Sequence, residues 1–153
     1  MQSFRAPSVS LAVPDGWQDA STYIVTGPKV LGFRPSVVVA FTQGVLDPYL
    51  KRHVDIQAGE MQQKLAGFSL IQRSDTLQMP FGQAIIMEYT WTSPEVRMPL
   101  HQYQMYVLAG QSLYTLTATA PAAEWATLQA TLLGIIRSFR PQSWPAAEPP
   151  VTP

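Results

Sequence analysis

The sequence of 153 residues predicts an α+β fold, with an antiparallel β-sheet and two main helices. Three observations lead to this prediction. Short segments rich in β-branched residues fill the first third of the chain, one amphipathic helical segment follows them, and longer strand-like segments precede a second helical one. The order strands, helix, strands, helix is typical of an α+β domain whose sheet is mostly antiparallel.

Three strands are expected before the first helix. Residues 9–13 alternate between apolar and small side chains, which is the period of a short strand. The Pro-Asp-Gly sequence at residues 14–16 predicts a turn, because proline fixes φ and glycine adopts conformations that other residues avoid. Residues 22–26 and the β-branched run at residues 36–42 predict the next two strands.

The first helix should begin at Asp47 and Pro48, where aspartate caps the helix and proline takes its first position. Gly67 predicts its end, because glycine is the usual residue just after a helix. Between them, apolar residues recur every three or four positions and form one stripe along the helix: Leu50, Val54, Ala58, Met61 and Leu65.

The second half of the chain predicts four more strands and the second helix. The strands are expected at residues 68–76, 82–91, 98–108 and 112–120. The helix should run from Pro121 to about Phe139 on an apolar stripe formed by Trp125, Leu128, Leu132, Ile135 and Phe139. These elements predict a single domain over residues 1–140. Five of the thirteen residues from 141 to 153 are proline, so we expect a Pro-rich disordered tail there.

The composition excludes several classes of function. Hydrophobic residues make up 46% of the chain and charged residues only 13%, whereas soluble domains carry about 25% charged residues. Ten basic and ten acidic residues cancel, which argues against binding to nucleic acid or to an anionic membrane surface. The chain has no cysteine and hence no disulfide. The first residues lack the features of a signal peptide, so a cytoplasmic location is expected.

The sequence offers no catalytic or metal-binding constellation. The two histidines, His53 and His101, are far apart in sequence, and neither has a partner at the spacing of a zinc site. Neither a phosphate-binding glycine loop nor a nucleophile elbow is present. Glu88 is expected to be a solvated or salt-bridged strand residue. We therefore predict a protein that is not an enzyme and needs no cofactor and no metal.

Several predicted strand faces carry small, apolar or amide side chains where a free surface normally carries charge. Ser36, Val38, Ala40 and Thr42 share one face of their strand, and Gln102 and Gln104 share one face of theirs. A face of this kind is suited to an apolar helix, whose stray polar groups the glutamines can satisfy. The alternative is that these residues face the helices of the domain itself.

Five motifs resemble those of the Eag chaperones of type VI secretion systems, a family related to DcrB. They are residues 13–21 (VPDGWQDAS), 65–68 (LAGF), 87–91 (MEYTW), 100–102 (LHQ) and 116–121 (LTATAP). They occur in the family's order, and the resemblance extends over about residues 2–140. Each motif is short, and their combination carries the specificity.

The resemblance implies a PsbP-like fold, usually homodimeric, that acts as an adaptor chaperone. Such a chaperone shields the hydrophobic N-terminal helices of a PAAR- or Rhs-type toxin effector and promotes loading of the effector onto the VgrG spike. By position, the helix-binding residues would be Ile24, Ser36, Val38, Ala40, Gln57, Leu65 and Gln102. Leu65 fits the core equally well.

Two residues of the predicted helix-binding region depart from the Eag pattern. Ala40 stands where the family has a more polar small residue, and Thr22 where it has an aliphatic one. The helix that this chain binds is therefore expected to differ in sequence or in hydrogen bonding.

Two other functions are compatible with the same predicted fold. One is a DcrB-like envelope protein, which would be expected to carry a signal sequence or a lipobox cysteine. The other is a small-molecule-binding domain or an enzyme with an apolar pocket, for which Glu88 and His101 would be the residues to mutate.

Overall fold

All the strands of the computed structural model belong to one antiparallel sheet of seven strands, and the model describes residues 14–16 and 22–141. The strand order is β1-β2-β7-β6-β5-β3, with the short strand β4 paired to β5. The elements are β1 (Thr22–Thr26), β2 (Ser36–Thr42), α1 (Leu50–Lys64), β3 (Ser69–Arg73), β4 (Leu77–Met79), β5 (Gly82–Ser93), β6 (Met98–Ala109), β7 (Ser112–Pro121), a 3₁₀ turn (Ala122–Glu124) and α2 (Trp125–Arg137).

The predicted fold class is confirmed, and most predicted strands lie within a few residues of the observed ones. Strands β1 and β2 have the predicted bounds, and the turn at residues 14–16 is present, with Gly16 at a φ of 85°. The short strand β4 was not predicted, because three residues are too few to show a period. The strand expected at residues 9–13 and the tail from residue 142 onward lie outside the described residues.

Both helices begin later than the sequence predicts. Helix α1 begins at Leu50, because the backbone of Tyr49 is extended (φ −97°, ψ 95°) and makes this residue the N-cap. A carboxylate oxygen of Asp47 still accepts a hydrogen bond from the backbone N–H of Tyr49 at 2.9 Å, just before the helix. It ends at Lys64, and the left-handed residue Gly67 (φ 65°) turns the chain toward β3. The 3₁₀ turn separates Pro121, the last residue of β7, from the start of α2.

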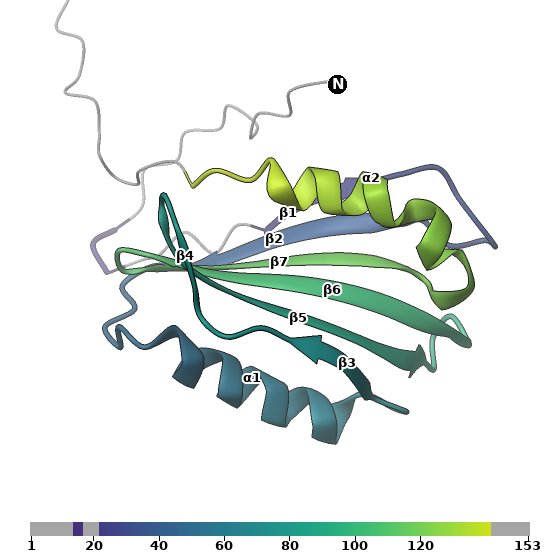
Figure 1. Ribbon diagram of the computed structural model, residues 1–153, viewed down its shortest axis with the longest axis horizontal. Coiled ribbons are helices and arrows are strands. Elements are labelled where there is room, and N and C mark those ends of the chain that lie inside the picture. Colours follow the sequence, from purple (N-terminus) through teal and green to yellow (C-terminus); the bar gives the residue numbers. More distant parts are fainter. Residues whose placement is uncertain (1–13, 17–21, 142–153) are drawn as a thin grey trace, which may run out of the picture.

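Side chains alternate between the two faces of the sheet and form a separate hydrophobic core on each face. On the α1 side, Leu50 and Val54 of the helix pack against Ile85, Tyr89 and Tyr106 of the sheet. On the α2 side, the core is formed by the sheet and helix residues Val37, Met105, Leu116, Ala118, Trp125, Leu132 and Ile136. Figure 1 shows the two helices on opposite sides of the sheet.

Neither helix is wide enough to cover its face of the sheet. A helix with its side chains is about 10 Å wide and neighbouring strands lie about 4.8 Å apart, so one helix covers about two strands. Helix α1 packs against β5 and β6, and α2 packs against β7 and β2 (Figure 1). Among the described elements, no helix therefore covers the half of the sheet formed by β1, β2 and β7 on the α1 side.

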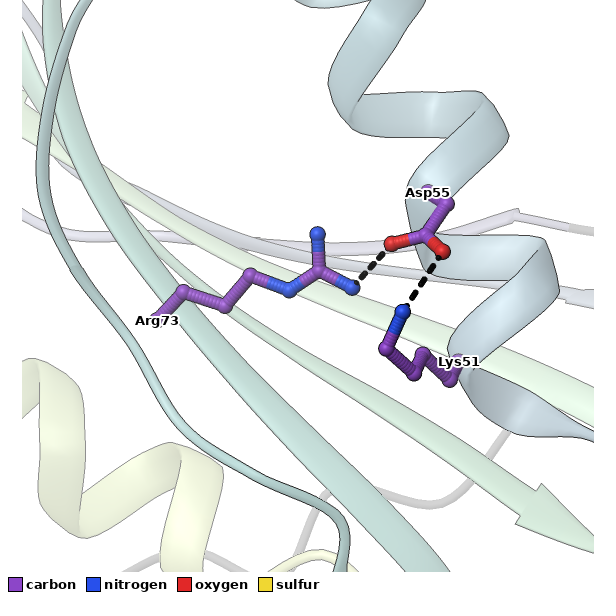
Figure 2. A network of polar contacts seen from close by, with 3 residues as sticks. All are labelled: Lys51, Asp55 and Arg73. Carbon is purple, nitrogen blue, oxygen red and sulfur yellow. Dashed lines mark hydrogen bonds and ion pairs between the residues drawn. The ribbon is translucent and has the colours of Figure 1, made fainter.

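An ion-pair network fixes α1 over its half of the sheet. Asp55 of the helix pairs with Arg73 of β3 at 2.5 Å and with Lys51, one turn earlier in the helix, at 3.1 Å (Figure 2). Arg73 and Lys51 hold the pKa of the Asp55 carboxyl below its ordinary value, mainly through their hydrogen bonds to it. The network ties α1 to the β3 edge, away from β1 and β2.

The backbone at Gly82 cannot accept a side chain. Its φ is 152°, and a Cβ atom there would lie 2.3 Å from the carbonyl oxygen of Leu108 on the neighbouring strand. We predict that Gly82→Ala lowers the free energy of unfolding by about 2 kcal/mol or more in urea denaturation, because backbone strain and a steric clash add.

Gly134 is the matched control for this substitution. It lies exposed in α2 with open space at its Cβ position, so Gly134→Ala should raise the free energy of unfolding by about 0.5–1 kcal/mol. Equal effects of the two substitutions would contradict this description of the β5–β6 contact.

Candidate functional site

The candidate site is the α1 side of the strands that α1 does not contact together with the adjoining β6, and we call it the α1-side surface; its Gln104 and Thr119 are buried at the border with the core. Its residues come from β1, β2, β7 and β6 and point to the same side as α1. They are Thr22, Ile24, Thr26, Ser36, Val38, Ala40, Thr42, Thr115, Thr117, Thr119, Gln102 and Gln104. None of them is charged, and Ile24 is 57% exposed.

The strand register arranges these residues in rows across the sheet. One row joins Ile24, Val38, Thr117 and Gln104. The next row joins Thr26, Ser36, Thr119 and Gln102, and a third joins Thr22, Ala40 and Thr115. Five of the seven residues that the sequence singled out, those on β1, β2 and β6, therefore lie side by side on one face.

The other two predicted residues lie on or just after α1. Gln57 is exposed and lines a cavity of about 170 Å³ between α1 and the sheet, together with Ala40, Thr42 and Thr115. It therefore borders the α1-side surface. Leu65 is half-buried and packs against the core beneath α1, so its side chain contributes to the packing of the domain.

The side-chain amide of Gln102 forms hydrogen bonds to residues of both neighbouring strands. Its amide oxygen accepts from the indole N–H of Trp91 at 2.7 Å, and its amide nitrogen donates to the hydroxyl of Thr119 at 2.8 Å. These hydrogen bonds link three strands, from β5 through β6 to β7. Gln102 thus has a structural role that the sequence does not reveal.

Gln104 forms a second chain parallel to the first. The hydroxyl of Tyr106 donates to its amide oxygen at 2.5 Å, and its amide nitrogen donates to the hydroxyl of Thr117 at 3.1 Å. Burial raises the pKa of Tyr106 far above its ordinary value, so this phenol stays protonated and remains a donor. The two chains of hydrogen bonds fix both glutamines, and each chain ends on a threonine hydroxyl oxygen that accepts.

The DcrB family model matches residues 9–138, which is most of the chain. The chain belongs to the DcrB family. No curated protein matches it significantly. Two solved structures resemble this DcrB-family chain over nearly its whole length, and both are below 25% identity, so they bear on the fold alone.

The first is a Pseudomonas aeruginosa protein of unknown function, PA94, with a TM-score of 0.76 and 21% identity, covering 91% of this chain and 95% of PA94. The second is cyanobacterial PsbP (CyanoP) from Synechocystis sp. PCC 6803, with a TM-score of 0.54 and 14% identity, covering 90% of this chain and 100% of CyanoP. The PsbP-like fold predicted for this DcrB-family domain is confirmed.

A buried polar pair that the sequence did not predict lies on the opposite face of the DcrB-family sheet. His101 Nε2 lies 2.5 Å from a carboxylate oxygen of Glu88, and the other carboxylate oxygen accepts from the Gln72 amide at 2.7 Å. The His101 ring stacks on Trp125 with 4.0 Å between ring centroids. Glu88 is buried rather than solvated, and its carboxylate is paired with the His101 ring.

The Glu88–His101 pair ties β5 and β6 to β3 and to the first turn of α2. The two residues are thirteen positions apart, so only the register of the β5–β6 pairing could have revealed their contact. Neither residue lines the cavity beside α1.

Residues 14–16 and 22–141 contain neither a metal-binding cluster nor a membrane-spanning helix. This part of the chain contains no group of three or more histidine or acidic side chains that could hold a metal ion. It also contains no helix that is long and apolar enough to cross a membrane.

Replacing Gln102 should destabilise the domain. In Gln102→Leu, the indole N–H of Trp91 and the hydroxyl of Thr119 lose their partner, and an unpaired buried polar group costs about 1–3 kcal/mol. We expect a decrease of that size in the free energy of unfolding by urea.

Gln57→Leu is the control, because Gln57 is exposed on α1 and its substitution should change stability by no more than about 0.5 kcal/mol. Equal unfolding midpoints for the two variants would show that the Gln102 hydrogen bonds do not stabilise the domain.

Proposed function

We propose that the protein is a binding chaperone of the Eag type, which shields apolar helices of a partner protein on the α1-side surface. Membership of the DcrB family and the PsbP-like fold support a scaffold of this kind. The five sequence motifs support the narrower Eag assignment. One structural observation carries the proposal: within residues 22–141, half of one sheet face has no charged side chain and no helix packed on it.

Burial of this surface beneath an apolar helix requires no desolvation of a charge. Ile24, Val38 and Ala40 would be removed from water, which contributes about 25 cal/mol for each Å² of apolar area. Charged side chains at the same positions would each cost several kcal/mol to bury without a partner. The absence of charge on this surface therefore lowers the desolvation cost of burying it beneath a hydrophobic helix.

Threonine hydroxyls supply the polar part of the recognition. The Thr117 hydroxyl oxygen accepts a hydrogen bond from Gln104, and Thr117 is only half-buried, so its hydroxyl proton would be able to turn toward a ligand, whereas Thr119 is buried. A docked helix presents backbone carbonyls and small polar side chains, which such a donor would satisfy. The surface thus offers apolar contact and hydrogen-bond donors at a spacing set by the strands.

The proposed partners are the hydrophobic N-terminal helices of a PAAR- or Rhs-type effector, which the chaperone would keep soluble in the cytoplasm until the effector is loaded onto VgrG. A homodimer is part of this proposal. The protein would act by binding alone, without catalysis and without a cofactor. Exclusion of water from the apolar effector helices is what prevents their aggregation.

The test is co-expression with the hydrophobic N-terminal segment of a PAAR-type effector, followed by purification without detergent and light scattering. The wild-type chain should yield a soluble complex that contains a chaperone dimer. Ile24→Asp should reduce the recovered segment about tenfold or more, because the helix would bury an unpaired carboxylate.

Ile71→Asp is the matched control. Ile71 lies on β3, at the opposite edge of the sheet from β1, and its exposed fraction of 51% is close to the 57% of Ile24. This variant should capture the segment as well as the wild type does. Equal loss in both variants, or failure of the wild type with every segment of a panel, would contradict the proposal.

A further inference from the structure

A groove lies on the other face of the sheet, beside α2. Its volume is about 340 Å³, within the range of about 300–1,000 Å³ that is typical of small-molecule sites. The hairpin of β4 and β5, the middle of β6 and the last turns of α2 form its walls. Apolar side chains line most of it, among them Met79, Phe81, Ile86, Met105, Leu133 and Phe139.

The groove exists for the same reason as the α1-side surface. Helix α2 packs against β7 and β2, so the α2 side of β5 and β4 has no helix above it. The two open regions lie on opposite faces of the sheet, and the groove shares no residue with the α1-side surface. It is therefore independent of the proposed helix-binding function.

Three polar side chains line the groove, and two of them are basic. Arg137 lies in the last turn of α2, and Arg140 follows the helix. The Nη1 atom of Arg140 donates to the backbone carbonyls of Arg137 at 3.1 Å and Phe139 at 2.6 Å, and its guanidinium lies 5.9 Å from the centre of the Phe81 ring. These contacts hold the second guanidinium against the apolar wall.

The third polar side chain is Tyr103 of β6. Burial raises the pKa of its phenol, the positive charge of Arg137 opposes this shift, and the negative charge of Glu88 adds to it. Tyr103 and Arg137 line the same groove. The hydroxyl stays protonated at neutral pH, and it donates to no other described residue. Within the described chain, the groove has no acidic lining residue, and neither arginine forms an ion pair.

We propose that this groove binds a small amphipathic carboxylate, such as a medium-chain fatty acid. The hydrocarbon chain would lie between the hairpin and α2, and the carboxylate would accept hydrogen bonds from Arg137, Arg140 and the Tyr103 hydroxyl. Guanidinium groups match a carboxylate in both charge and geometry. The apolar lining excludes a small hydrophilic anion, because such a ligand would leave the groove unfilled.

The test measures binding of decanoate to the full-length protein, by displacement of a fluorescent dansyl-undecanoic acid probe. Decanol, which has the same chain and no charge, is the comparison ligand. Arg137→Gln should weaken decanoate binding about tenfold or more, because it removes a charge-assisted hydrogen bond, and should leave decanol binding unchanged. Ile86→Phe narrows the groove and should weaken both ligands.

Lys64→Gln is the matched control, because Lys64 is the basic residue in the last turn of α1 as Arg137 is in α2. It should leave decanoate binding unchanged. The proposal is overturned if decanoate does not displace the probe at millimolar concentration. It is also overturned if Arg137→Gln and Lys64→Gln bind decanoate equally, since the binding would then be independent of the groove.

Discussion

The width of a helix relative to the spacing of strands determines the surface of this protein. A helix covers about two strands of a sheet, and in the described part of the chain this sheet is six strands wide along its main path with one helix on each face. The helices lie over different strand pairs, α1 over β5 and β6 and α2 over β7 and β2. Each face therefore keeps an uncovered region, and these two regions are the sites on which the functional proposals rest.

An uncovered sheet face normally carries charged side chains. On the α1 side, the polar side chains are uncharged glutamines and threonines, which form hydrogen bonds with one another. Gln102 and Gln104 link the aromatic side chains of the α1-side core to the threonines of β7. The polar groups at the border between core and surface are thereby paired without ionised side chains. Hydroxyl and amide groups supply the polar part of this surface, so its burial under an apolar partner would require no desolvation of a charge.

The sequence predicts the elements of this fold better than their contacts. Local signals sufficed for β1, β2 and the apolar stripe of α1, and they failed at the start of α1, where the extended backbone of Tyr49 delays the helix. The shared face of Ile24, Val38 and Ala40 follows from strand period. The Glu88–His101 contact and the hydrogen bonds of Gln102 depend on the register of β5, β6 and β7, which no local signal encodes.

The most direct test of the account is whether a bound apolar helix covers the α1-side surface. The chain has no cysteine, so Ser36→Cys and Ser138→Cys each introduce a single thiol for labelling with a maleimide. Ser36 lies on the α1-side surface, in the row with Thr26 and Thr119, and Ser138 is exposed at the end of α2. In complex with an effector segment, the account predicts that the thiol at position 36 is protected while that at position 138 reacts as in the free protein. Equal labelling at position 36 in the free and bound states would contradict it.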